Sequence, residues 1–121
     1  MKKLVVFIVL ILSLFLGACS AEKIQQVNVY ETDSFSTVRK DPLLTITNTQ
    51  EIEDLVRAFN KAKKVSGVVD VANPDYFVEA GEDSYFLWIE QDQGSIMHED
   101  DSHTLYSFSK KSAKTVYELI N

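Results

Sequence analysis

The sequence predicts a single α+β domain built from a mainly antiparallel sheet and two helices. Two segments repeat their apolar residues at helical spacing, one in the middle of the chain and one at its end. Between them, four short apolar segments are separated by turn residues, which is typical of an antiparallel meander. A chain of 121 residues whose first 18 are largely apolar has no room for a second folded domain.

The amino-terminal segment has the three parts of an export signal. Lys2 and Lys3 give it a positive start, an apolar run of 13 residues follows from Leu4 to Leu16, and small residues precede Cys19. As a helix this run would span only about 20 Å, which is short of the hydrocarbon core of a bilayer. We therefore expect the segment to be removed rather than kept as a membrane span.

The residues before Cys19, Leu16-Gly17-Ala18, resemble the lipobox of bacterial lipoproteins. This resemblance implies removal of residues 1–18 and a diacylglyceryl (palmitate-type) anchor on Cys19. Residues 19–23 would then be a short lipidated tether and residues 24–121 the folded domain, on the extracytoplasmic face of the cell membrane. Cys19 is the only cysteine, so no internal disulfide can form. The alternatives are an ordinary secretory signal and an uncleaved anchor.

The charge of the chain argues against a nucleic-acid partner. The net charge is -6, and it becomes -8 when Lys2 and Lys3 leave with the signal segment. A nucleic-acid binder needs a basic face to displace counterions from phosphates. The same negative charge gives no attraction to anionic lipid headgroups, so the acyl chains would have to hold the protein on the membrane.

The first half of the domain predicts two strands and a helix. Alternating apolar residues indicate strands at 24–29 and 44–47, whereas 31–39 could be a weak strand or a loop. Asn48 and Glu51 have the spacing of a capping box, which predicts a helix start. That helix is expected to end at Gly67, with a shared apolar face made of Ile52, Leu55, Val56, Phe59 and Ala62.

The second half predicts the meander and the last helix. The four strands are expected at 76–78, 85–89, 95–97 and 104–108, and the segment 85–89 is apolar on both faces, as in a central strand. Ser109 is the expected cap of a helix whose shared face is Ala113, Val116, Tyr117 and Ile120. We expect the helices to cover one face of the sheet and the N-terminal strands to cover the other.

Both histidines of the protein lie in the segment His98-Glu99-Asp100-Asp101-Ser102-His103. If 99–102 form a four-residue hairpin loop, His98 and His103 face each other with Cβ atoms about 5 Å apart. Two imidazoles with a carboxylate such as Asp101 could then hold a divalent transition metal. The alternative is a solvated hairpin, because turns collect polar residues for reasons unrelated to binding.

Aromatic residues of the central strand have two explanations. Phe86 and Trp88 point to one face, while Tyr85, Leu87 and Ile89 point to the other. They can simply fill the core. Alternatively, the face with Phe86 and Trp88 remains open as a partner surface with Trp88 as its anchor.

Four short motifs resemble those of the YhfM-like small lipoproteins of Gram-positive bacteria. They are Pro74-Asp75-Tyr76, Leu87-Trp88-Ile89, Gly94-Ser95-Ile96-Met97 and Thr104-Leu105-Tyr106-Ser107. The resemblance implies a surface lipoprotein, and it brings no catalytic residues because these motifs consist of packing and turn residues.

The sequence therefore favours a non-catalytic binding or interaction module at the cell surface, held by lipid at Cys19. No catalytic residue and no cofactor are predicted, and neither the partner in the cell envelope nor the oligomeric state can be derived. The alternative function is a metal-binding protein or metal-dependent extracytoplasmic enzyme that uses the His98–His103 loop.

Overall fold

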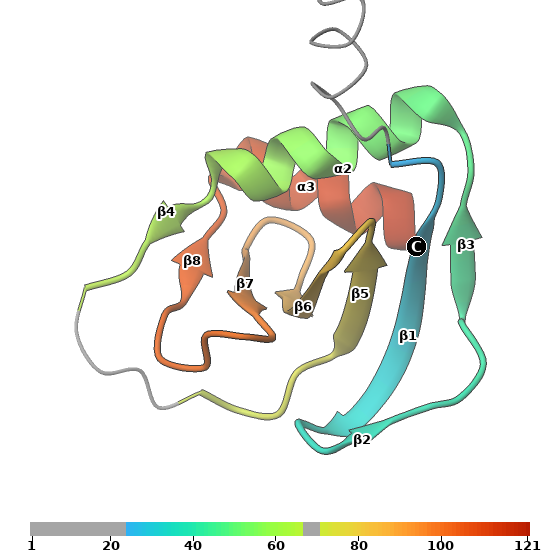
Figure 1. Cartoon of the computed structure of the whole chain (residues 1–121). Helices are drawn as coiled ribbons and strands as arrows, with labels where there is room; N and C mark the ends of the chain where they lie inside the picture. Colours follow the sequence, from blue (N-terminus) through green and yellow to red (C-terminus); the bar gives the residue numbers. More distant parts are fainter. Residues whose placement is uncertain (1–23, 67–70) are drawn as a thin grey trace, which may run out of the picture.

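Eight strands and two helices make up the part of the chain that the computed structural model describes, residues 24–66 and 71–121 (Figure 1). The helices are α2 (Thr49–Lys61) and α3 (Lys110–Ile120). The strands are β1 (Val27–Ser34), β2 (Thr37–Val38), β3 (Leu44–Ile46), β4 (Lys63–Lys64), β5 (Tyr76–Ala80), β6 (Asp83–Ile89), β7 (Gly94–His98) and β8 (Tyr106–Ser107). The predicted α+β class is confirmed.

All strands belong to one antiparallel sheet with the order β2-β1-β5-β6-β7-β8-β4, and β3 also pairs with β1. The strands β5 to β8 form the predicted meander. The apolar strand β6 lies in the middle of the order, as its composition predicts, because a strand with apolar residues on both faces must be covered on both sides.

Alternation along β6 separates two hydrophobic clusters. Leu87 and Ile89 belong to the main core between the sheet and the helices, whereas Phe86 and Trp88 belong to a smaller cluster on the other face. The predicted division of these residues between the two faces is confirmed. We call the face that carries Phe86 and Trp88 the outer face.

Both helices begin where their capping residues predict. The Asn48 side chain accepts a hydrogen bond from the Glu51 amide at 3.1 Å, and the Ser109 hydroxyl accepts one from the Ser112 amide at 3.1 Å. The helices lie side by side on one side of the sheet (Figure 1). Leu55 of α2 is fully buried in the core between the helices and the sheet. Within the described residues, neither helix is long and apolar enough to cross a membrane.

Helix α2 ends earlier than its sequence predicts. It stops at Lys61, and Ala62 is already extended with ψ 139°, so the predicted stop at Gly67 is wrong. The reason is tertiary, because Lys63 and Lys64 pair with β8 as the edge strand β4. Gly67 itself lies outside the described residues.

The N-terminal strands do not cover the outer face, which corrects a second expectation. β1 pairs with β5 and so extends the same sheet. The uncertain segment 31–39 turns out to be partly strand, because β1 continues to Ser34 and β2 follows after a tight turn. Part of the cover of the outer face comes from Phe35 in that turn and from Val65 and Val71.

Candidate functional site

On the outer face, the side chains that lie opposite one another across neighbouring strands are large at one level of the sheet and small at the next. In the middle row, Phe77, Phe86 and Met97 lie opposite one another across β5, β6 and β7, and all are large. Two residues further along the strands, Trp88 lies opposite Ser95, and Ser95 lies opposite Ser107 of β8. Residues in register share a face, so the half-buried indole of Trp88 has two short hydroxyl side chains beside it.

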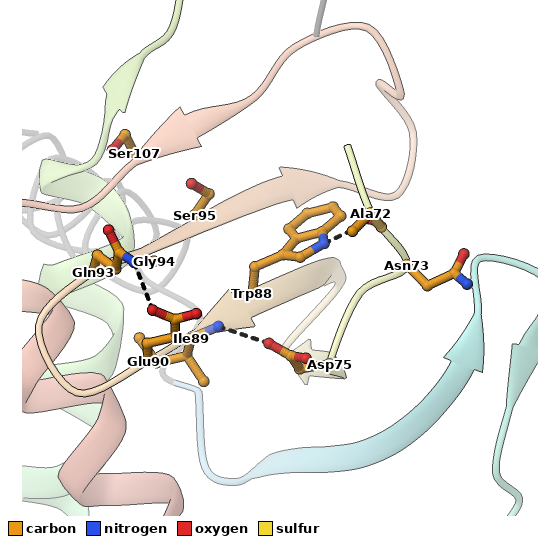
Figure 2. A pocket seen from close by; sticks show the side chains of 10 residues that line it. All are labelled: Ala72, Asn73, Asp75, Trp88, Ile89, Glu90, Gln93, Gly94, Ser95 and Ser107. Atoms are coloured by element: carbon orange, nitrogen blue, oxygen red, sulfur yellow. Dashed lines mark hydrogen bonds between the residues drawn. The ribbon is translucent and has the colours of Figure 1, made fainter. Parts of the chain in front are cut away.

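This difference in size leaves a hollow beside Trp88, which we call the Trp88 groove (Figure 2). Its volume is about 390 Å³. It lies where β6 turns into β7 and where the chain enters β5, and it is lined by Ala72, Asn73, Asp75, Trp88, Ile89, Glu90, Gln93, Gly94, Ser95 and Ser107. Carboxylate, amide and hydroxyl groups thus surround one aromatic ring, and polar groups beside an aromatic side chain can orient a ligand that packs on it.

Hydrogen bonds fix the wall of the groove that the 72–75 segment forms. The Trp88 indole Nε1 donates to the Ala72 carbonyl at 2.9 Å. The Asp75 carboxylate accepts from the Ile89 amide at 3.1 Å, where β6 leaves the ladder (Figure 2). Both bonds join the segment before β5 to β6, so the indole and the carboxylate are held in place before any ligand arrives.

Gly94 lets the chain pass close beneath the groove. A Cβ atom at this position would lie 2.6 Å from the Trp88 carbonyl oxygen and 2.7 Å from Ile89 Cδ1. Neither distance is tolerated between real atoms, so only glycine allows β7 to start at this point. The turn before it is closed by Gln93, whose side-chain amide donates to the Glu90 carboxylate.

A second hollow, of about 360 Å³, adjoins the first. The two share Asp75, Ile89 and Glu90 as lining residues. Arg39 lines the second hollow and forms ion pairs with Glu31 at 3.4 Å and Asp33 at 3.9 Å. The hollows together form a strip across one end of the sheet that is richer in carboxylates than in cations.

The structure separates the two residues of the predicted partner surface. Phe86 is buried, with 9% of its surface exposed, and the Phe35 ring lies edge-on to it with a centroid distance of 5.1 Å. Trp88 lines the groove instead. Of the two, Trp88 alone is placed to meet a partner.

The two histidines do not face each other, so the predicted register of this hairpin is wrong. His98 lies opposite Tyr85 of β6, whereas on its other side β7 pairs with β8 at Ser95–Ser107 and Ile96–Tyr106, and β8 comprises Tyr106–Ser107 rather than 104–108. The connection between β7 and β8 is therefore longer than four residues. His103 lies in a turn, where its amide donates to the Asp101 carboxylate at 3.1 Å. Among the described residues, no group of three or more histidine, cysteine, aspartate or glutamate side chains is spaced to hold a metal ion.

His98 has carboxylate neighbours of its own. Its Nε2 lies 3.1 Å from Asp83 Oδ1, and its Nδ1 accepts from the Asp100 amide at 3.2 Å. The imidazole packs edge-on against Tyr85, and both line a hollow of about 370 Å³ on the helix-covered side. Burial raises the pKa of the Tyr85 phenol, and the Asp83 carboxylate adds to the rise.

Asp101, the predicted carboxylate partner of the histidines, has a structural role in the turn. Hydrogen bonds from the Thr104 side chain and from the His103 amide lower the pKa of its carboxyl below the usual value of an aspartate. These bonds hold the connection between β7 and β8 in its observed conformation.

Sequence reasoning missed Asp75, Ser95 and Ser107 as members of a site with Trp88. Ser95 could have been found from the sequence. The length of the turn between β6 and β7 fixes the register of the hairpin, and that register places Ser95 opposite Trp88. Ser107 could not have been found in this way, because no short turn fixes the position of β8.

Comparison with known proteins identifies the family. Residues 21–121 match the family described as YhfM protein. The chain belongs to the YhfM family. The resemblance seen in the four short motifs is thus confirmed, and it extends over most of the chain. Among curated proteins, no sequence matches this chain.

The fold of this family member is similar to that of a thioesterase-like protein from Clostridium sporogenes ATCC 15579. The TM-score is 0.60 with 12% sequence identity, over 79% of this chain and 93% of the other. At this identity the similarity concerns the arrangement of helices and strands alone, and function has to be argued from the residues.

Proposed function

We propose that the protein is a lipid-anchored module on the extracytoplasmic face of the cell membrane, and that it binds an envelope component in the Trp88 groove. The observation that carries the proposal is the hollow beside a hydrogen-bonded tryptophan at one end of the sheet. Tryptophan is enriched among the residues that carry binding energy, and ligand pockets combine aromatic side chains with a few polar groups that orient the ligand.

The position of the groove suits an anchor at Cys19. Ile24, the first described residue, lies against Gly81 in the turn between β5 and β6, since a Cβ on Gly81 would come within 3.2 Å of its side chain. The four residues between Cys19 and Ile24 reach about 14 Å when fully extended. The end of β6 at Asp83 would therefore be near the membrane.

The groove lies at the opposite end of β6, beyond Trp88 and Ile89. A strand of seven residues is about 20 Å long, so the groove would face away from the bilayer. A lipid-anchored protein with this orientation presents the groove to the cell envelope rather than to the lipid surface.

The groove favours binding over catalysis. Its described lining contains serine hydroxyls but no histidine or lysine, the residues that usually activate a serine as a nucleophile. The metal-dependent alternative at the His98–His103 loop has less support, because β8 begins at Tyr106 and His103 lies in the turn after Asp101 rather than opposite His98.

The anchor is tested by mass spectrometry of protein extracted from membranes. We expect a mature chain that begins at a diacylglyceryl-modified Cys19, and we expect Cys19→Ala to leave the signal uncut and unlipidated. A mature chain that begins elsewhere, or that carries no lipid, would contradict this half of the proposal.

The groove is tested by photo-crosslinking in living cells. A photoreactive amino acid replaces Gln93 at the exposed rim, and in a matched control it replaces Glu118 on the exposed side of α3. We expect an adduct from position 93 and none from position 118. Equal adducts from both positions, or none from position 93, would contradict the assignment of the groove.

A further inference from the structure

We propose that the Trp88 groove recognises a chain of uncharged sugar rings, because an indole, two serine hydroxyls and planar carboxylate and amide side chains meet along one strip at one end of the sheet. The inference rests on the proposed function above and names the class of ligand. Each property of the strip limits the chemistry of its occupant.

The indole supplies a fixed apolar platform. Trp88 is held by its hydrogen bond to Ala72, and the Phe35 ring packs beside it with a centroid distance of 5.8 Å. The face of an aromatic ring is negative and attracts the weakly positive C–H groups of a ligand. Pyranose rings carry such C–H groups on one face, and a ring that is already immobile loses little entropy when it binds them.

The polar lining suits a ligand whose groups both donate and accept hydrogen bonds. Ser95 and Ser107 offer hydroxyls, Asn73 offers an amide and Asp75 offers a carboxylate with acceptor positions beyond the one used by Ile89. Sugar hydroxyls are both donors and acceptors, so they can use all of these groups. A purely apolar ligand such as an acyl chain would leave them without partners, at a cost in binding free energy.

The charge of the strip excludes polyanions. Glu31, Asp33, Asp75 and Glu90 line the two hollows, and Arg39 is the cation among their described lining residues. Arg39 is already paired with the first two of these carboxylates. A phosphate-rich polymer would place like charges together, which costs binding free energy, whereas an uncharged sugar would not.

The length of the strip favours a chain over a single ring. The two hollows share Asp75 and Glu90, so a ligand that leaves the Trp88 groove past these residues enters the second hollow directly. A site at the end of the central strands differs from sites that bind extended peptides, which add a strand to an open sheet edge. Trp88 lies on the central strand, far from either edge in the strand order.

The first experiment uses the intrinsic fluorescence of Trp88, which is the only tryptophan of the chain. The full-length protein, in a detergent without a sugar headgroup, is titrated with fully N-acetylated chitotetraose, cellotetraose and maltotetraose. We expect a saturable change in emission with at least one of the three. The absence of any change up to about 10 mM, where even a Kd of about 1 mM would be visible, overturns the inference.

Two variants locate the binding. Ser95→Leu on β7 fills the hollow, and Ser84→Leu on β6 makes the same change on the same face of the sheet but outside the groove. We expect the first to weaken sugar binding by at least about tenfold and the second to leave it unchanged. Equal affinities for the two variants would overturn the assignment to this groove.

The adduct at position 93 separates failure of this inference from failure of the proposed function. After proteolysis of the adduct, an added mass on the peptide with position 93 that a glycan-cleaving enzyme removes supports the sugar ligand. An added mass that is itself a peptide overturns the sugar ligand but leaves the groove as a binding surface. If no adduct forms, both proposals fail.

Discussion

Trp88 lies directly opposite Ser95 in the register of β6 and β7, so the largest side chain of the outer face has a very small one as its cross-strand neighbour. In the preceding row the same two strands place Phe86 opposite Met97, and both are buried. The large pair fills the space above the sheet, whereas the small serine leaves a hollow beside Trp88. The site is therefore formed by the strands themselves and needs no movement of a loop.

The first prediction concerns the hollow itself. Ser95→Leu places a branched apolar side chain beside the indole, where the serine leaves space for a ligand. We expect the adduct at position 93 to be lost while the melting temperature changes by only a few degrees, because residue 95 is not part of the main core. The yield of adduct and a thermal melt check both parts. Loss of the fold instead of the adduct would show that Ser95 is required for packing.

The second prediction concerns Gly94. A methyl group there would meet the Trp88 carbonyl oxygen and the Ile89 side chain at distances below 3 Å, so the β6–β7 turn must shift. Overpacking of this kind costs about 1–3 kcal/mol. In a domain of this size each kcal/mol lowers the melting temperature by roughly 4–8 °C. A melting temperature of Gly94→Ala equal to that of the unaltered protein would contradict the close approach.

The third prediction tests the main core with a matched pair of leucines. Leu55 is fully buried on α2, whereas Leu43 before β3 is 52% exposed. We expect Leu55→Ala to cost about 2–5 kcal/mol and Leu43→Ala less than about 0.5 kcal/mol in the free energy of unfolding. Denaturant titration of the two variants measures both values, and similar losses would mean that α2 does not pack as described.

The fourth prediction concerns the turn that contains His103. The Thr104 side chain and the His103 amide lower the pKa of Asp101, so the carboxylate is favoured in the folded state. Their contribution to stability is present above the ordinary pKa of an aspartate and is lost as the pH falls through the lowered value. Thr104→Val removes one donor.

We expect the pKa of Asp101 in this variant to rise toward its ordinary value. Carboxyl NMR titration of the two proteins measures the change. An unchanged pKa would show that Thr104 does not bond to Asp101 in solution.

Local rules predict much of this fold. The caps Asn48 and Ser109 bind the amides three residues on, and the alternation from Tyr85 to Ile89 assigns each side chain to its face. These features depend on neighbours in sequence, so the sequence contains them in full.

Features that depend on distant pairing were not predictable. Lys63 and Lys64 have no strand pattern, and they form β4 only because β8 lies beside them. The prediction that His98 lies opposite His103 was wrong because the turn held by the hydrogen bonds of Asp101 makes the connection to β8 longer than expected. The Trp88 groove was missed because its lining comes from the end of β6, the start of β7 and the segment before β5. These segments meet only in the folded sheet.

The most direct test of the account is the yield of the crosslinked adduct at position 93 in cells that carry Trp88→Ala, Trp88→Phe or the unaltered residue. If the indole anchors an envelope ligand, we expect about a tenfold loss with alanine and a smaller loss with phenylalanine, which keeps an aromatic face. Equal yields in all three proteins, at equal amounts in the membrane, would contradict a binding site built on Trp88.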